Sequence, residues 1–334
     1  MIMKKVLIFG GAGYCGSLLV PQLLNEGWEI TVYDMMWYGT DQFPKSPKLH
    51  LIKGDVRDLK KVKEACIDKD SVLHLACISN DASFELDEEL STSVNLNSFE
   101  PLVLAAKEAG VSRFVFASSS SVYGISDSPN VTEDHPLVPL TLYNKYKGMC
   151  EPLLLKHTSK DFIGVVFRPA TVCGYSPRQR LDLSVNILTN HAVNKNKILV
   201  FGGDQLRPNL HIQDYADLCK LLLTAPDKKI ADEIFNVGFD NMTIMAIAEV
   251  VKKVVEEIFP DKNAIPIDVT ISNDPRSYHI NSDKIKRTLG FRPKYSVEDA
   301  VRDLCHAFRE GKLSNSFDDN RYYNVRTMKS AGAK

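Results

Sequence analysis

A short apolar segment that ends in three regularly spaced glycines constrains the fold of this chain more than any other feature. Residues 6–9 are apolar without alternation, which is typical of a strand buried on both faces of a parallel sheet. After it, Gly10 permits a sharp turn and Gly13 lets the backbone come close to a pyrophosphate. Gly16 lets the next helix, expected over residues 17–26, pack closely on the strand. Free N–H groups at the start of that helix would receive the phosphates.

The residues that follow favour a dinucleotide over other ligands. A second strand is expected at residues 29–33, and Asp34 stands at its tip. A carboxylate there can accept both ribose hydroxyls and repels a 2′-phosphate, so the pattern predicts NAD rather than NADP. Tyr14 and Cys15, inside the glycine loop, are included among the predicted cofactor contacts. The alternative is a glycine-rich turn in another doubly wound protein, with Asp34 as a loop acid.

Charge and cysteine content exclude several classes of function. The 334 residues include 41 basic and 42 acidic side chains, so no global field attracts nucleic acid or an anionic membrane. The seven cysteines contain no C-x-x-C pair, and we therefore expect no metal site and no disulfide framework. No apolar stretch approaches 18 residues, and the apolar run at the amino end is too short for a signal peptide. A cytoplasmic location is the expectation.

Strand and helix patterns alternate as far as residue 170. Strands are expected at residues 49–53, 71–75, 113–117 and 162–168. This alternation predicts an α/β fold with a Rossmann-type, doubly wound parallel sheet. A long helix is expected over residues 87–109, bent by Pro101.

Polar and small residues follow the predicted strands, at the edge where such sheets bind ligands. Asp55 could accept from an adenine amino group, or it could cap the helix that begins near Leu59. Small residues after the fourth strand would let a nicotinamide ribose lie flat, and the polar loop beyond them could touch substrate. The predicted cofactor contacts of this edge are Asp55, Val56, Leu75, Ala76 and Cys77, and the predicted substrate contacts of the loop are Ser79 and Asn80.

Tyr143 and Lys147 are candidate catalytic residues. They are four positions apart and share one face of a helix. A lysine ammonium together with the positive nicotinamide of NAD+ would lower the pKa of the phenol, which could then exchange a proton with an alcohol. Ser119 would hydrogen-bond the same oxygen. The alternative is a surface Tyr–Lys pair beside a polar loop, and the position of both segments after strands of one sheet favours the catalytic interpretation.

The sequence resembles the extended short-chain dehydrogenase/reductase family, the nucleotide-sugar epimerases and dehydratases, over about residues 4–310. The resemblance implies bound NAD, a nucleotide-diphosphate sugar substrate, and a smaller, interleaved α/β substrate-binding domain. Residues 1–173 would form the NAD-binding domain, rejoined by 208–241, and residues 174–207 and 242–334 would form the substrate domain. The matching pieces are Gly10-x-x-Gly13-x-x-Gly16, Asp34, residues 54–58, His74-Leu75-Ala76, Asn95, residues 118–124, Tyr143-x-x-x-Lys147 with Glu151, Arg168-Pro169, residues 207–212 and residues 235–238; by this match Asn95 and Pro169 are cofactor contacts.

Departures from the family pattern narrow the reaction. Family dehydratases carry an Asp-Glu pair where this chain has Ser120 and Ser121, and family decarboxylases have an acid after the catalytic Ser or Thr. These serines are predicted substrate contacts that cannot support elimination. What remains is NAD-dependent epimerisation, most often at C4, through a keto intermediate. The alternatives are a nucleotide-sugar 4-dehydrogenase or reductase with net redox, and a protein that binds NAD or a nucleotide sugar without turnover.

The family resemblance also suggests residues for the substrate and for assembly. Arg207 and Arg276 are similar to the pair that binds the diphosphate, and a surface ion pair is the alternative for each arginine. His74 and His211 are expected to be structural. Members of the family dimerise through a four-helix bundle, and apolar Leu102, Val103, Leu153 and Leu154 are compatible with a homodimer. Further predicted substrate contacts are Thr171, Arg178, Arg180 and Asn186.

Overall fold

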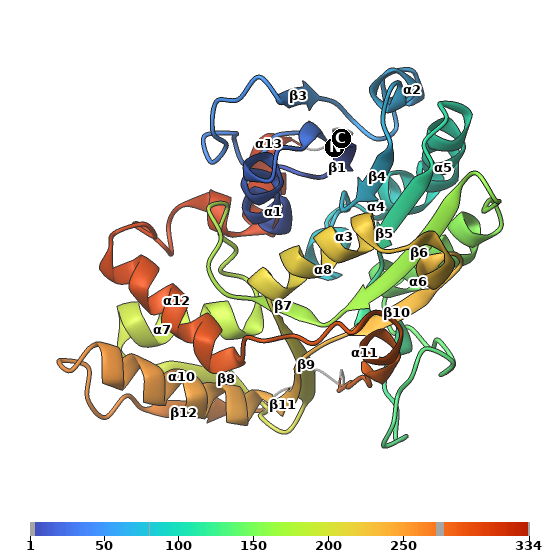
Figure 1. The fold of residues 1–334 in the computed structure, drawn as a ribbon. Coiled ribbons are helices and arrows are strands. Elements are labelled where there is room, and N and C mark those ends of the chain that lie inside the picture. Colours follow the sequence, from blue (N-terminus) through green and yellow to red (C-terminus); the bar gives the residue numbers. More distant parts are fainter. Residues whose placement is uncertain (1–3, 80, 272–276, 333–334) are drawn as a thin grey trace.

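The computed structural model describes residues 4–79, 81–271 and 277–332 of the chain. At its centre is a seven-stranded sheet in which every neighbouring pair is parallel (Figure 1). The strand order β10-β6-β5-β4-β1-β2-β3 confirms the predicted doubly wound fold. The strands are β1 (Lys5–Phe9), β2 (Glu29–Asp34), β3 (Leu49–Lys53), β4 (Ser71–His74), β5 (Arg113–Ala117), β6 (Ile163–Pro169) and β10 (Ile234–Val237).

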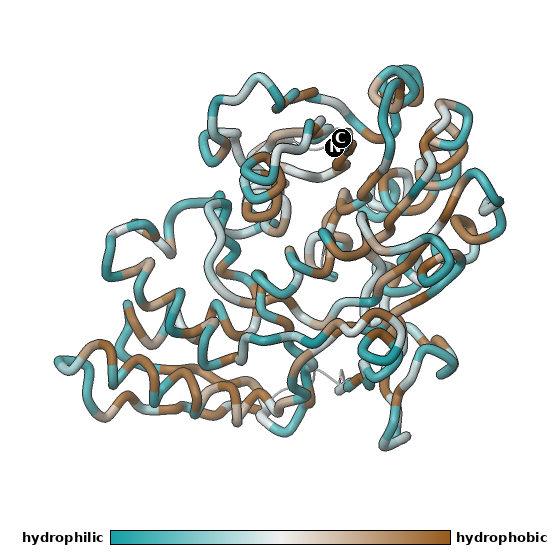
Figure 2. The backbone as a smooth tube through the Cα atoms, in the orientation of Figure 1, coloured by the Kyte–Doolittle hydropathy of each residue, from teal (hydrophilic) through white to brown (hydrophobic). Residues whose placement is uncertain are grey.

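Helices cover both faces of this sheet, which is why its strands are apolar without alternation. On one face, α1 (Tyr14–Asn25) and α8 (Ile212–Thr224) contact each other and share a core with β1, β5 and β6. On the other face lie α2 (Leu59–Cys66), α5 (Phe99–Glu108) and α6 (Leu142–Leu155). Hydrophobic residues are concentrated along the strands between these layers (Figure 2).

The long helix expected over residues 87–109 is divided into three pieces. They are α4 (Glu88–Thr92), the π-helical turn η1 (Ser93–Asn97) and α5. Asp87 is the N-cap of α4 and Ala109 the C-cap of α5, so the predicted bounds are confirmed, and the junction residues Ser93 and Ser98 keep helical backbone angles. The sequence did not predict the π-helical turn, which ends four residues before Pro101.

A second group of elements forms its own core beside the sheet (lower left in Figure 1). Helices α7 (Ser184–Lys195), α10 (Ile244–Ile258) and α12 (Val297–Arg309) contact one another there. Thr243 caps α10 by accepting from the Ala246 N–H at 3.1 Å, as the sequence predicted. The small sheets are β8 (Ile198–Phe201) with β12 (Ile267–Thr270), and β7 (Thr171–Cys173), β9 (Leu206–His211) and β11 (Asp240–Thr243); the remaining helices are α3 (Asp81–Phe84), η2 (Ser120–Tyr123), α9 (Asp227–Ile230), α11 (Asp283–Leu289), η3 (Asn320–Tyr322) and α13 (Asn324–Ala331).

The C-terminal helix α13 crosses back to the Rossmann part of the chain. Met328 on this helix packs in a small apolar cluster with Trp37, Ile78, Leu90 and Val94. These partners belong to the loop after β2 and to the segment after β4. The sequence placed this tail with the substrate domain. Its helix contacts the Rossmann part through Met328, and it contacts Arg178 and Asp182 of the expected substrate domain through Asn324.

Most of the apolar residues suggested for a dimer interface are buried in the core of the chain itself. Leu102, Val103 and Leu154 are completely buried in the core beneath α5 and α6. Their neighbours Leu104 and Met149 are the exposed apolar residues of these helices, at 36% and 42% exposure. If a second copy packs on these helices, Leu104 and Met149 are therefore the apolar side chains that can contact it, in place of Leu102, Val103 and Leu154.

Candidate active site

A cleft of about 850 Å³ runs along the carboxyl ends of the parallel strands. Its lining extends from the glycine loop, past the serines after β5, to Arg207 and Tyr278 in the second group of elements. Most of the residues predicted to bind cofactor or substrate line this cleft. They are Gly10, Gly13, Tyr14, Cys15, Gly16, Asp34, Asp55, Val56, Leu75, Ala76, Cys77, Ser79, Ser119, Ser120, Ser121, Tyr143, Lys147, Pro169, Thr171, Arg178, Arg180 and Arg207.

The glycine loop has the geometry that a dinucleotide requires. Gly10 has a φ of +77°, and a Cβ at this position would lie 2.5 Å from the backbone nitrogen of Ala76. A Cβ at Gly16 would lie 2.2 Å from the carbonyl oxygen of Gly11, so this glycine packs on the loop rather than on the strand. Gly13 is the N-cap of α1 and supplies no side-chain cap. The first turn of α1 can therefore receive an anion.

Tyr14 and Cys15 line the floor of the cleft at the start of α1. The Tyr14 hydroxyl donates to the Gly174 carbonyl at 2.6 Å, which connects α1 to the loop after β7. Burial raises the pKa of the Cys15 thiol to about 12, so it stays neutral. Both residues thus present uncharged groups to the cleft.

Asp34 is held by the backbone around it. Its carboxylate accepts from the Ala12 N–H at 3.0 Å and from the Met36 N–H at 2.7 Å. Burial raises the pKa of Asp34, and these two hydrogen bonds oppose the rise. The acid is thereby oriented at the tip of β2, where the sequence expected a ribose-binding carboxylate.

Asp55 does not cap α2. Asp58 does so by accepting from the Lys61 N–H at 3.1 Å. Asp55 instead binds the Arg57 guanidinium at two points, with Nη2 to Oδ2 at 2.6 Å. Burial acts to raise the pKa of Asp55, but the Arg57 contacts outweigh it and the pKa is lowered. Of the two roles considered for Asp55, the capping role is thus wrong.

The candidate catalytic side chains come from α6 and from the turn after β5. The Lys147 ammonium is buried and donates to the Ala117 carbonyl at 2.7 Å. Ser119 and Ser121 share a hydrogen bond of 2.7 Å between their hydroxyls, and Ser121 also donates to Asn144. Tyr143 lies one turn before Lys147 on α6 and lines the same cleft.

Burial dominates the pKa of Tyr143 in the protein by itself, whereas the sequence prediction concerned Lys147 acting together with bound NAD+. Burial raises the pKa of this phenol well above 10, and the nearby Cys77 adds to the rise. The Arg180 guanidinium acts in the opposite direction. The phenol is thus kept protonated by its burial, and charge brought by bound molecules must assist its ionisation.

A buried network fixes the serine turn to the sheet. Glu151 accepts from Ser118 at 2.5 Å and from Arg168 at 2.6 and 2.9 Å. Arg168 also donates to the Tyr123 hydroxyl at 2.6 Å, and Tyr123 donates to Asn236 at 2.7 Å. The network joins α6, β5, β6 and β10, so it holds the turn that carries Ser119 in register with α6.

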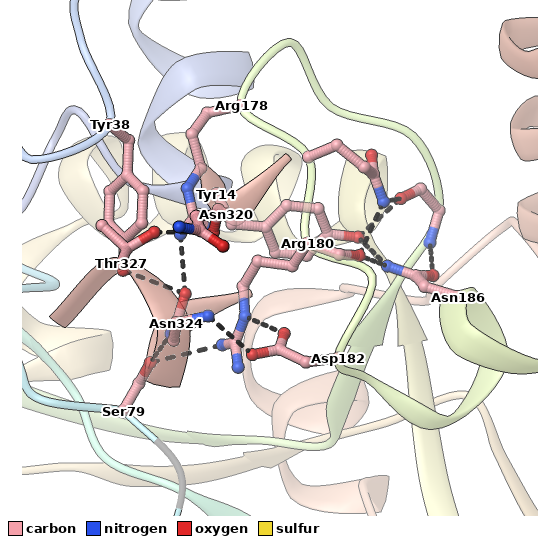
Figure 3. A network of polar contacts seen from close by, with 12 residues as sticks. Tyr14, Tyr38, Ser79, Arg178, Arg180, Asp182, Asn186, Asn320, Asn324 and Thr327 are labelled. Carbon is pink, nitrogen blue, oxygen red and sulfur yellow. Dashed lines mark hydrogen bonds and ion pairs between the residues drawn. The ribbon is translucent and has the colours of Figure 1, made fainter. Parts of the chain in front are cut away.

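A second polar network, drawn in Figure 3, lines the cleft beside α13. Arg180 donates to Asp182 at 2.9 Å and to Ser79 at 3.3 Å. Arg178 donates to Asn324 of α13 at 2.6 Å, and its guanidinium lies 3.5 Å from the centre of the Tyr38 ring. Sequence reasoning missed Tyr38, Asp182 and Asn324, which had no motif to identify them.

Two of the predicted ligand contacts, Asn95 and Asn186, do not line the cleft, and two others lie outside the described residues. The Asn95 carboxamide accepts from the Ile78 N–H at 2.8 Å and donates to the Ile78 carbonyl at 2.9 Å, and the residue is not part of the cleft lining. Asn186 is fully buried and bonds Gly174, Tyr14 and the Arg180 carbonyl, so it too is structural. Asn80 and Arg276 lie outside the described residues.

Comparison with known proteins identifies the family. A family model for the NAD dependent epimerase/dehydratase family matches residues 6–238. The chain belongs to this family. UDP-glucose 4-epimerase of Lactobacillus helveticus is 28% identical over 324 residues, covering 89% of this chain and 94% of that protein. dTDP-glucose 4,6-dehydratase of an Actinoplanes species is 24% identical over 324 residues, covering 92% and 98%.

Solved structures show the same fold. The UDP-glucose 4-epimerase of Thermus thermophilus, in complex with NAD, superimposes with a TM-score of 0.79 over 91% of this chain and 99% of that one, at 24% identity. The relatives include both epimerases and dehydratases, so membership of the family does not by itself select one reaction.

NAD is the cofactor of this family, and the cleft fits it. The uncapped start of α1 and the acid at the tip of β2 are placed for a diphosphate and an adenosine ribose. Among the described residues, no three His, Cys, Asp or Glu side chains cluster as metal ligands would. In the same part of the chain, none of the helices is both long enough and apolar enough to cross a membrane.

Proposed function

We propose that this protein is an NAD-dependent nucleotide-sugar epimerase that inverts C4 by transient oxidation to a keto intermediate. The observation that carries the proposal is that the carboxylates described in the cleft lining already have hydrogen-bond partners, and none of them follows the catalytic serine. Elimination needs a carboxylate beside the reacting sugar, and the turn after β5 supplies Ser120 and Ser121 instead. The carboxylates of the described cleft lining are engaged by other groups: Asp34 by backbone N–H groups, Asp55 by Arg57, Asp81 by Thr141, and Asp182 by Arg180 and Asn324.

Tyr143 and Lys147 of α6 and Ser119 of the serine turn have separate roles in the proton transfer. Bound NAD would supply the hydride acceptor for the oxidation and, once reduced, the hydride donor for the return step. The Tyr143 phenolate takes the proton of the sugar hydroxyl and gives it back to the other epimer. The Ser119 hydroxyl donates to Ser121, because Ser121 donates to Asn144; with sugar bound, it would turn its proton to the sugar oxygen and keep that oxygen beside Tyr143. Lys147, held on Ala117, places its positive charge near the phenolate.

The remainder of the cleft suits a nucleoside diphosphate. Its far end is lined by Arg207, whose guanidinium lies 5.3 Å from the Tyr278 ring centre, and by apolar Leu199 and Phe201. A guanidinium is the donor of choice for a diphosphate, and apolar and aromatic side chains suit a base. The UDP-glucose 4-epimerase relatives support a uridine sugar as the first substrate to try.

The proposal is tested by incubating the purified protein with NAD+ and a panel of nucleotide sugars. Absorbance at the NADH band and anion-exchange chromatography are followed together. A new isomer of equal mass without lasting NADH is the expected result. A product that has lost water or CO2 would instead assign the chain to the dehydratase or decarboxylase branch.

Two alternatives have distinct outcomes in the same assay. A nucleotide-sugar 4-dehydrogenase would accumulate NADH together with a keto sugar. A non-catalytic binding protein would give no product, and the Tyr143→Phe variant would then bind sugar and cofactor as the parent does with no activity to lose. For an epimerase, Tyr143→Phe lowers turnover by about 100- to 10,000-fold, the contribution of one acid/base group, while NAD+ binding changes little.

We also propose a homodimer built on α5 and α6, as in the family bundle. The exposed Leu104 and Met149 on these helices are the apolar side chains available to it. Light scattering after size exclusion, on the parent and on a Leu104→Glu/Met149→Glu variant, tests the assembly. A parent that elutes as a monomer at micromolar concentration would refute it.

A further inference from the structure

Arg178 was expected to bind the substrate, but its contacts lie on the cofactor side of the cleft. Its backbone N–H donates to Ser17 Oγ at 3.1 Å, in the first turn of α1. Its guanidinium lies over the ring of Tyr38, four residues after the ribose-binding Asp34. Asp34 and Arg178 are also close enough to shift each other's pKa. The side chain therefore stands beside the glycine loop and the tip of β2.

The guanidinium of Arg178 lacks a full set of partners. The residue is 6% exposed, and its Nε has no hydrogen-bond partner among the described residues. Its partners are neutral: the Asn324 carbonyl oxygen at 2.6 Å and the Tyr38 ring. The nearby carboxylates are engaged elsewhere, Asp34 by backbone and Asp182 by Arg180 and the Asn324 N–H. No carboxylate of the described residues hydrogen-bonds this buried guanidinium, and its unpartnered Nε leaves a donor for a further anion.

The helix that holds Arg178 also closes this half of the cleft. Asn324, at the first position of α13, accepts from Tyr38 at 3.0 Å and donates to Ser79 at 2.7 Å. Met328, one turn later, is clustered with Trp37 and with residues after β4. The C-terminal helix thus bridges the loop after β2 and the segment after β4, both of which line the cleft (Figure 3).

We propose that Arg178 binds the diphosphate of NAD, and that α13, latched through Asn324, closes over the bound dinucleotide and slows its release. The diphosphate would lie between the uncapped start of α1 and the Arg178 guanidinium, where two groups of the protein offer N–H donors to one anion. An epimerase returns hydride from the same cofactor molecule, and retention suits that cycle. The assignment requires NAD binding alone and stands whether or not the sugar reaction proposed above is correct.

Binding measurements on the full-length protein test the assignment of Arg178. Isothermal titrations with NAD+ and, separately, with UDP are made on the parent, Arg178→Met, Arg178→Lys and the control Arg302→Met, whose surface arginine pairs with Glu257 and Glu298. We expect Arg178→Met to weaken NAD+ binding by about 10- to 100-fold, the loss of a hydrogen bond to a charged group. UDP affinity stays at the parent value, and Arg178→Lys recovers part of the loss.

Other outcomes would overturn this assignment. Weaker UDP binding with unchanged NAD+ binding would return Arg178 to the substrate, as the sequence suggested. Unchanged binding of both would make the buried guanidinium structural. Circular dichroism melting of each variant accompanies the titrations, and the Lys variant, which keeps the charge and much of the volume, covers the case in which the Met variant does not fold.

The latch is tested by the rate of cofactor release. NADH bound to the parent, to Asn324→Ala and to Met328→Ser is displaced by excess NAD+ in a stopped-flow fluorimeter. We expect release to be about tenfold faster in either variant, since a tenfold change corresponds to about 1.4 kcal/mol, the size of one such contact. Equal release rates in all three proteins would show that α13 does not close the cofactor site.

Discussion

The ammonium of Lys147 donates a hydrogen bond of 2.7 Å to the carbonyl oxygen of Ala117, the last residue of β5. It also lies 5.0 Å from the centre of the Phe116 ring. This contact sets the register between α6 and β5. Because Tyr143 is one turn before Lys147 and Ser119 is two residues after Ala117, the contact brings phenol and hydroxyl to one edge of the sheet.

Replacing Lys147 by Met is expected to reduce both turnover and stability. The variant removes the charge beside Tyr143 and leaves the Ala117 carbonyl buried without its donor, at a cost of about 1–3 kcal/mol. Turnover of the epimerised sugar should fall by about 100-fold or more, as for loss of a group that assists acid/base catalysis. Steady-state kinetics and urea unfolding measure the two effects. A variant with parental kinetics would remove Lys147 from the mechanism.

The buried pair of Glu151 and Arg168 should be strongly coupled. Glu151→Met leaves a guanidinium 4% exposed without its carboxylate, and we expect a loss of about 3–5 kcal/mol in the free energy of unfolding. The double variant Glu151→Met/Arg168→Met should lose less than the two single variants together, because no unpaired charge remains. Urea unfolding of the four proteins completes the cycle. Additive losses would argue against a coupled pair.

His74 should make the protein less stable in acid. It lies among Phe9, Phe99 and Phe116, and burial lowers its pKa from 6.5 to about 3, with a further contribution from Lys147. Below pH 6.5 the unfolded chain binds a proton that the folded chain refuses until about pH 3. Stability is therefore lost as pH falls through this window, by up to about 1.4 kcal/mol per pH unit from this group.

The control for this prediction is His74→Phe, which fits the aromatic surroundings and cannot titrate. Its unfolding free energy between pH 6.5 and 4 should decline less steeply than that of the parent, while the two proteins are similar at pH 8. Chemical unfolding at several pH values gives both slopes. Parallel slopes would mean that His74 is protonated in the folded state.

Gly13 and Gly16 should respond differently to alanine. A Cβ at Gly16 would lie 2.2 Å from the Gly11 carbonyl oxygen, and the backbone must move, at an expected cost of about 1–3 kcal/mol. A Cβ at Gly13 meets only the Gly10 oxygen, at 3.2 Å, so Gly13→Ala should fold nearly as the parent does. Its methyl group stands where the diphosphate approaches, and NAD+ affinity should fall. Thermal melting and titration with NAD+ separate the two effects.

Local sequence patterns were sufficient to predict the parallel sheet and the ligand edge. β3 and β5 have the predicted bounds, Thr243 caps α10, and Gly290 ends α11 with a φ of +71°. Each of these features depends on neighbouring residues, either through the periodicity of apolar side chains or through the backbone freedom of a glycine. The same holds for the glycine loop and for the spacing of Tyr143 and Lys147.

The tertiary structure alone decided which polar residues meet in and around the cleft. Asn324 bonds Tyr38 across 286 positions of sequence, and Asn186 bonds Tyr14 across 172. Such pairs have no period and no motif, because each is selected only when chain closure buries both groups and requires them to satisfy each other. For the same reason, the sequence could identify Arg178 as a candidate ligand of an anion, while only the folded chain placed it beside the cofactor loop.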